Sequence, residues 1–278
     1  MRINHNIAAL NTHRQLASAS NAQSKSMEKL ASGLRINRAG DDAAGLAISE
    51  KMRGQIRGLD MASKNAQDGI SVIQTAEGAL NEVHSILQRQ RELAVQSASD
   101  TNVAADRTAL GDEFSQLTAE VKRITDQTEF NGMRLLDKSA NGATGVLKIQ
   151  VGANATQSMD LKLDTAGVDL TAVNTALGLA KVDTQANADL ALTSLDTQIA
   201  SVSSGRSYLG ATQNRLEHTI SNLDNASENL TGAESRIRDV DMAKEMMNQT
   251  KNSILSQAAQ AMLAQANQQP QGVLQLLR

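Results

Sequence analysis

Residues 195–230, LDTQIASVSSGRSYLGATQNRLEHTISNLDNASENL, decide the fold. Positions spaced alternately four and three apart form one seam for about five heptad repeats, which is typical of a coiled coil or helix bundle. The seam consists of Leu195, Ile199, Val202, Arg206, Leu209, Gln213, Leu216, Ile220, Leu223, Ser227 and Leu230. Its three interruptions are polar, and polar seam residues weaken a helix pair but fix its register.

Two earlier segments have the same helical spacing. Their seams are Val72, Ala76, Ala79, Val83, Ile86, Gln90 and Leu93, and then Leu110, Phe114, Leu117, Val121 and Ile124. Turns are expected at residues 99–102 and at Asn131-Gly132. We therefore predict a mainly α fold, an elongated helical bundle or coiled coil in which the late helix returns antiparallel to the earlier pair.

In a short middle segment the apolar residues recur every two positions instead of every three or four. Apolar and polar residues alternate over 147–151 and again over 159–163, with Gly152-Ala153-Asn154 at the start of the connection. Alternation around a turn predicts a small β-hairpin. Residues 164–183 are rich in Thr, Ala and Gly and are expected to form a loop with short structure.

The two ends carry diluted helical seams. These are Ala9, His13, Leu16, Ser20, Gln23, Met27, Leu30 and Leu34, and then Val240, Ala243, Met247, Thr250, Ile254, Gln257, Ala261 and Ala264. Single helices with such weak apolar faces are marginal in water. We expect the ends to order only when partners cover them.

Composition excludes several classes. The chain has three aromatic residues, one proline and no cysteine, which favours long helices and excludes a disulfide framework. The net charge is −3 with both signs mixed, so nucleic-acid binding is unsupported. No apolar run is long enough for membrane insertion, and Met1–Asn6 does not begin a cleaved secretory signal.

No motif for chemistry is found. The four histidines lack the spacing of a helical metal pair, and no nucleophile elbow or Gly-rich phosphate loop occurs. Asp41-Asp42 allows a cation site, but the favoured interpretation is a helix start with Arg35 or Arg38 as ion-pair partners. The ten methionines suit a promiscuous binding surface less well than a core or interface. We predict no enzyme, no cofactor and no metal.

Both ends resemble the bacterial flagellins, and in particular the short flagellins of Bacillus-type bacteria. The resemblance is carried by MRINHNIAALNT (1–12), LASGLRIN (30–37), AGDDAAGLAI (39–48), SQ (256–257), AMLAQAN (261–267) and VLQLLR (273–278). It implies that the two terminal helices pair into an inner coiled-coil assembly domain made of residues 1–45 and 236–278. It also implies an outer helical domain of residues 46–235, with a hairpin at about 140–170 and no large variable domain.

The resemblance implies a structural subunit that self-assembles into an open helical polymer outside the cell. The expected assembly residues are Ile3, Ile7, Leu10, Leu16, Met27, Leu30, Leu34, Asp41, Asp42, Met247, Ile254, Leu255, Met262, Leu274 and Leu277. We expect Asp41 and Asp42 to contact arginines of neighbouring subunits. The implied partners are a secretion chaperone, the export apparatus, and the filament cap and hook-associated proteins.

Members of the family are also detected by a Toll-like innate immune receptor. The segment QRQRELAV (88–95) resembles the main epitope, so Arg89, Leu93 and Glu120 are expected receptor contacts. Other interpretations remain open: a hook–filament junction protein, or a finite helical bundle with a signalling or binding role. A filament subunit polymerises without limit, whereas a finite bundle has a fixed oligomer size.

Overall fold

The computed structural model describes residues 6–137, 145–165 and 167–276, with side chains up to residue 268. Its elements are α1 (Ile7–Ser32), α2 (Ala43–Ser97), α3 (Ala104–Gln127), β1 (Glu129–Phe130), β2 (Met133–Arg134), β3 (Val146–Gln150), β4 (Ser158–Lys162), α5 (Thr171–Leu179), α6 (Gln185–Arg238) and α7 (Met242–Leu276). They form two compact units. The terminal unit is Met1–Gly54 with Glu228–Arg278, and the central unit is Gln55–Ser227. The predicted mainly α fold is confirmed.

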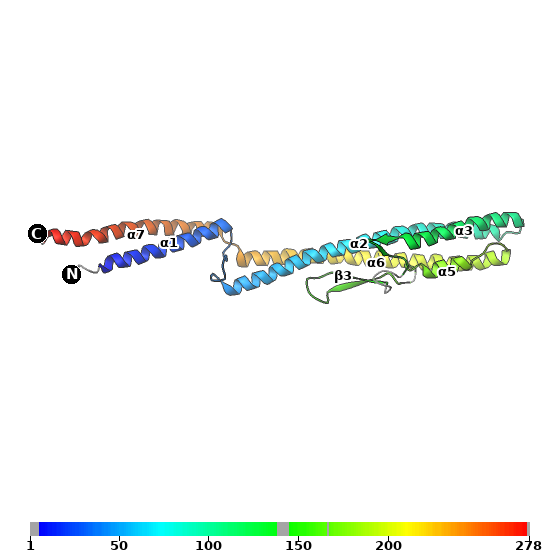
Figure 1. Cartoon of the computed structure of the whole chain (residues 1–278), viewed down its shortest axis with the longest axis horizontal. Helices are drawn as coiled ribbons and strands as arrows, with labels where there is room; N and C mark the ends of the chain where they lie inside the picture. Colours follow the sequence, from blue (N-terminus) through cyan, green and yellow to red (C-terminus); the bar gives the residue numbers. More distant parts are fainter. Residues whose placement is uncertain (1–5, 138–144, 166, 277–278) are drawn as a thin grey trace. The chain divides into compact units, whose positions relative to one another are not determined.

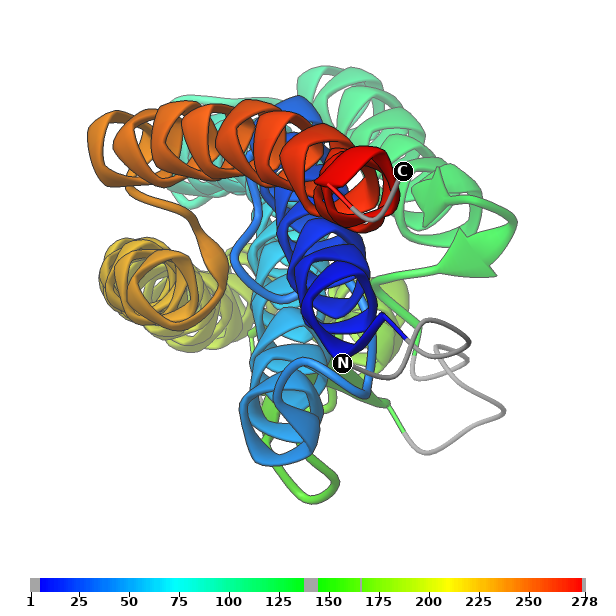
Figure 2. The ribbon, with the colours of Figure 1, turned by 90° about the vertical axis from the view of Figure 1, so that its left-hand side faces the viewer.

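In the terminal unit, α1 and α7 lie side by side and run antiparallel (Figures 1 and 2). Asn6 joins them at one end, because its Oδ1 accepts the N–H of Ala9 at 3.1 Å and its Nδ2 donates to the carbonyl of Ala266 at 2.7 Å. At the other end Leu34 and Asp239 form a β-bridge. The predicted pairing of the terminal helices is therefore confirmed.

In the central unit, α2 and α6 pair in opposite directions. The Ser227 hydroxyl donates to Asp60 at 2.9 Å, and further along Arg91 donates to Asp196 at 2.6 Å. One column of the predicted α6 seam is buried over five successive positions, Leu195, Val202, Leu209, Leu216 and Leu223, and its last member, Leu230, is half-buried. The three polar interruptions all fall in the other column, which is only half-buried. Arg206 in this column is partly exposed and its guanidinium lies 4.0 Å from the Glu77 carboxylate, although its buried Nε has no hydrogen-bond partner among the described residues.

Helix α3 packs against the same α2 helix and widens the buried surface of α2. The fully buried Gln90 donates to the Phe114 carbonyl at 3.2 Å and to the Thr118 hydroxyl at 2.8 Å. The predicted α2 seam is correct but incomplete. Ile73, Leu80 and Leu87 are also fully buried, because two neighbouring helices cover two adjacent stripes of α2.

The predicted β-hairpin is confirmed as β3 and β4, which pair antiparallel with Leu147 opposite Leu161 and Ile149 opposite Met159. Each strand is held to a helix. Asn65 of α2 donates to the Gln150 carbonyl at 3.3 Å, and the Lys162 N–H donates to the Tyr208 hydroxyl of α6 at 3.1 Å. The hairpin therefore packs over the helical core, and hydrogen bonds to helix side chains satisfy some of the backbone groups at its edges.

Candidate assembly surface

Helix α7 turns its small and polar face toward α1. The covered positions repeat every four and three residues: Glu245, Gln249, Asn252, Ser256, Ala259, Leu263 and Ala266. The seam predicted from Ala243 to Ala264 is wrong for this helix pair, because all its members from Ala243 onward are exposed. Short side chains let the two helices approach closely, whereas the larger apolar residues would hold them apart.

In helix α1, too, one column of the predicted seam differs from the residues that are covered by the partner helix. Its covered positions are Ala9, Thr12, Leu16, Ala19, Gln23, Ser26 and Leu30. His13, Ser20 and Met27 were predicted in place of Thr12, Ala19 and Ser26, and all three are exposed. The prediction placed this column one residue too late, and the residues that are covered there, Thr12, Ala19 and Ser26, are all small.

The apolar residues excluded from the α1–α7 contact gather on the outward face of α7. Met246, Met247, Ile254 and Leu255 are exposed and line a surface hollow of about 510 Å³ together with Thr250 and Lys251. Large apolar side chains left in water are unfavourable, by about 1.5–3 kcal/mol each relative to burial. A contiguous face of this kind marks an interaction site.

The structure places the expected assembly residues in three groups. Ile7, Leu10, Met27, Asp41, Met247, Ile254, Leu255 and Met262 are exposed. Leu16, Leu30, Leu34 and Asp42 are half-buried. Ile3 and Leu277 lie outside the described residues, as does the side chain of Leu274. The exposed apolar members are thus available to bind another molecule, and Leu16 and Leu30 belong to the intrachain contact.

The connection between α1 and α2 is ordered by local bonds. Gly33 ends α1 with a φ of 71°, a left-handed conformation that favours glycine. Asp42 Oδ1 accepts the Gly45 N–H at 2.8 Å and so caps α2. A Cβ on Gly45 would lie 2.8 Å from Ile36 Cδ1, so glycine allows the buried Ile36 to pack against this turn.

The arginines expected to pair with the two aspartates are engaged elsewhere. Arg38 forms an ion pair with Glu28 at 2.9 Å, and Arg35 Nε donates to the Ile237 carbonyl at 3.2 Å. Asp41 instead accepts the backbone N–H of Arg38 at 3.1 Å and that of Asn37 at 3.3 Å. The helix-start interpretation agrees with this geometry, whereas the ion pairs with Arg35 and Arg38 are wrong.

The N–H of Arg38 is the main cause that lowers the pKa of Asp41 below its ordinary value of 3.8. A depressed folded-state pKa gives stability that is present above the ordinary value and is lost as the pH falls through the folded pKa. We therefore expect the Arg38 amide resonance to be constant at neutral pH and to shift only at acid pH. In Asp41→Asn that acid shift should disappear, and a shift unchanged by the substitution would contradict the assignment.

The side chains of the three expected receptor contacts differ in solvent exposure. Arg89 is exposed on α2, and its bond to Glu113 at 2.8 Å is the main cause that raises its pKa. Glu120 on α3 is half-buried, and a hydrogen bond from Arg123 lowers its pKa. Leu93 is only 1% exposed and lies in the hydrophobic core. Leu93 therefore supports the α2 surface from beneath and is not available to a protein partner.

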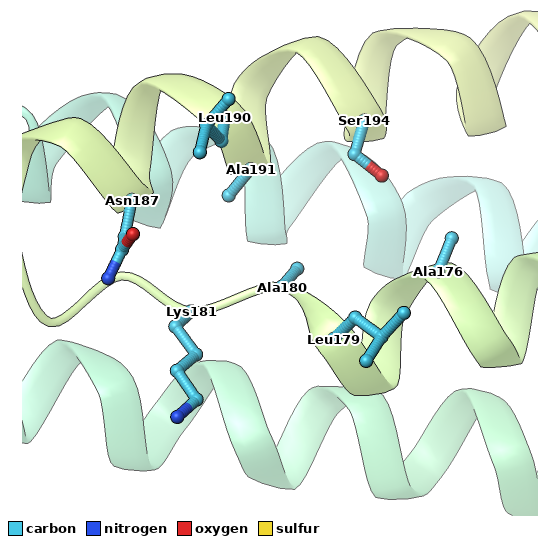
Figure 3. Close-up of a pocket in the computed structure, with 8 residues that line it drawn as sticks. All are labelled: Ala176, Leu179, Ala180, Lys181, Asn187, Leu190, Ala191 and Ser194. Atoms are coloured by element: carbon cyan, nitrogen blue, oxygen red, sulfur yellow. The ribbon is translucent and has the colours of Figure 1, made fainter.

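The central unit contains a second apolar hollow of about 360 Å³, where the end of α5 meets the start of α6 (Figure 3). Leu179 and Leu190 are strongly exposed there, and Lys181 points away from Leu190. Within the described ranges, no group of three or more His, Cys, Asp or Glu side chains is placed to hold a metal ion. In the same part of the chain, no helix combines the length and apolarity needed to cross a membrane.

Paired terminal helices with an apolar face turned outward define a mainly helical protein with an exposed apolar surface on its terminal unit. The model of the bacterial flagellin N-terminal helical region matches residues 3–141, and that of the C-terminal helical region matches residues 192–277. The chain belongs to the flagellin family.

Individual relatives agree with this assignment. The chain is 64% identical to flagellin of Halalkalibacterium halodurans over 278 residues and 58% identical to flagellin of Bacillus subtilis over 304 residues, with all of each chain covered. The crystal structure of Bacillus cereus flagellin superimposes with a TM-score of 0.52 at 34% identity, covering 58% of this chain and 88% of that one. The protein is a structural subunit of the bacterial flagellar filament, which such subunits form by self-assembly outside the cell.

Proposed function

We propose that residues 1–45 and 236–278 form the inner assembly part of the subunit and residues 46–235 its outer part. The observation that carries this proposal is the orientation of α7. Its small and polar face meets α1, and its apolar face around Ile254 and Leu255 is left for a neighbouring copy. Open helical growth requires that this contact joins the α7 face of one copy to a different surface of the next, with a rotation that does not close into a ring.

Seeded polymerisation tests this proposal. Purified full-length chain and a chain lacking residues 1–34 are mixed with short filament fragments and examined by negative-stain microscopy. The full chain should give long uniform filaments. The deletion should give none, because the partner helix of α7 is absent. Discrete oligomers from both chains would favour the alternatives, a hook–filament junction protein or a finite signalling bundle.

Asp41 and Asp42 are proposed to contact arginines of neighbouring subunits. Each carboxylate already accepts local N–H bonds, but the exposed Asp41 keeps access to solvent. Carboxylate–guanidinium bonds are charge-assisted and directional. Polymerisation at the wild-type rate after Asp41→Asn and Asp42→Asn together would contradict this role.

The chain is proposed to be non-enzymatic and to leave the cell through the flagellar export apparatus with the help of a secretion chaperone. Terminal helices that order only on binding suit passage of an unfolded chain. The cap and hook-associated proteins are proposed to meet the same terminal surfaces. A chain ending at Val240 should lose the chaperone in co-purification, and retention of the chaperone would contradict binding near α7.

Recognition by a Toll-like innate immune receptor is proposed to use Arg89 and Glu120, with Leu93 shaping the surface from within. The Arg89 side chain is exposed and the Glu120 side chain is partly exposed, on neighbouring helices of the central unit. In a receptor-reporter assay on monomeric protein, Arg89→Ala with Glu120→Ala should weaken the response at least tenfold, about 1.4 kcal/mol. Arg215→Ala, at an exposed position of α6, is the matched control. Full potency of the double variant would rule out this site.

A further inference from the structure

Two adjacent methionines, Met246 and Met247, occupy the centre of the outward face of α7. Their exposed fractions are 57% and 67%, and both line the hollow that also contains Ile254 and Leu255. By contrast, Met159 in the hairpin is 8% exposed and packs into the core. The pair is thus open to solvent and set within an apolar surface.

We propose that Met246 and Met247 form an oxidation site through which hydroperoxides block subunit assembly. This inference rests on the proposed role of the α7 face. In the reaction the thioether sulfur attacks one peroxide oxygen, an S–O bond forms and the O–O bond breaks. The proton of the attacked oxygen passes to the second oxygen, which leaves as water from hydrogen peroxide or as an alcohol from an organic hydroperoxide. The sulfur loses two electrons and the peroxide gains them. The product is methionine sulfoxide.

Oxidation changes the character of the hollow. A thioether is apolar and adaptable, whereas a sulfoxide is polar and carries a strong hydrogen-bond acceptor. Docking a neighbouring apolar surface over Met246 and Met247 would then bury a polar group without a partner, which is unfavourable. Sulfoxides at these two positions should therefore weaken the contact without disturbing the α1–α7 pair, whose covered face lies on the other side of α7.

Access to the site depends on assembly. In the free subunit both sulfur-bearing side chains are exposed, whereas a docked neighbour would cover them. Peroxide should therefore oxidise this pair in free subunits and spare it in finished filaments. Methionine sulfoxide reductases restore the thioether, so the block should be reversible.

The test uses the full-length chain and the variant Met246→Leu with Met247→Leu. Leucine keeps the volume and apolarity of methionine but cannot be oxidised. Free subunits are treated with hydrogen peroxide, the peroxide is removed with catalase, and sulfoxides are located by mass spectrometry before seeded polymerisation. Wild type should elongate about tenfold or more slowly after treatment, as expected for a buried unpaired polar group. The double variant should be slowed much less than wild type, because its remaining exposed methionines on the terminal helices, Met27, Met242 and Met262, lie outside the hollow.

Met61→Leu is the matched control, since Met61 is 55% exposed but belongs to the central unit. This variant should lose polymerisation on treatment as wild type does. Equal slowing of the Met246→Leu, Met247→Leu variant, or no slowing of wild type with both sulfoxides formed, would overturn the inference. Failure of the α7 face itself would be seen separately, as normal polymerisation of untreated Ile254→Glu.

Discussion

Ile254→Glu is expected to abolish filament growth while leaving the free subunit folded. Ile254 is 61% exposed and belongs to the apolar face of α7 that lines the hollow. A glutamate is harmless there in the free chain, but a docked neighbour would bury its charge without a partner. That penalty is several kcal/mol, so seeded elongation should slow by roughly 100-fold or more.

Gln260→Glu provides the control for charge alone. Gln260 is exposed on the same helix, outside the residues that line the hollow, and its substitution adds the same carboxylate. This variant should polymerise within a few-fold of wild type, and both variants should show the wild-type thermal melting curve by circular dichroism. Filaments formed by Ile254→Glu at the normal rate would remove the α7 face from the assembly contact.

Leu209→Ala is expected to produce the largest loss of stability among single changes in the long α6 helix. Leu209 is fully buried and belongs to the buried column of α6. Truncating it removes apolar contacts and leaves a cavity that helices can fill only in part. We expect the free energy of unfolding to fall by about 2–5 kcal/mol, as measured by chemical denaturation.

Gln213→Ala tests whether the two columns of the seam differ as the burial pattern indicates. Gln213 is half-buried, and its amide donates to Glu217 of the same helix at 2.9 Å. Its loss should change the free energy of unfolding by about 0.5 kcal/mol or less. Similar losses for both variants would show that the seam is covered evenly and would contradict the buried-column description.

The helices and the hairpin of the central unit could be predicted from the sequence, because large apolar side chains form their contacts. Buried residues recur every seven positions from Leu195 to Leu223, which identifies the buried face of the α6 helix. Apolar and polar residues alternate from Leu147 to Val151, which identifies the face of a strand that packs against the core. The second buried stripe of α2, through Ile73 and Leu80, was missed. Its burial depends on how many helices pack against α2, and that number cannot be deduced from the spacing of apolar residues within α2.

The terminal unit was predicted in its pairing but not in its contact faces. A search for the most apolar seam selects Met247 and Ile254 in α7, whereas the intrachain contact uses Ser256 and Ala259. That rule assumes that the strongest face is used within the chain. Under the proposed assembly the most apolar face is kept for the neighbouring copy, and a weaker face of small and polar residues serves the intrachain pair.

The side chain of Asn6 makes the order of each end depend on the other. One amide caps α1 through Ala9 and holds the carbonyl of Ala266, 260 positions later in the sequence. A chain cut short before Ala266 lacks the carbonyl that this amide holds. Truncation of the last helix should therefore loosen the first turn of α1, so that damage at one end of the chain is felt at the other.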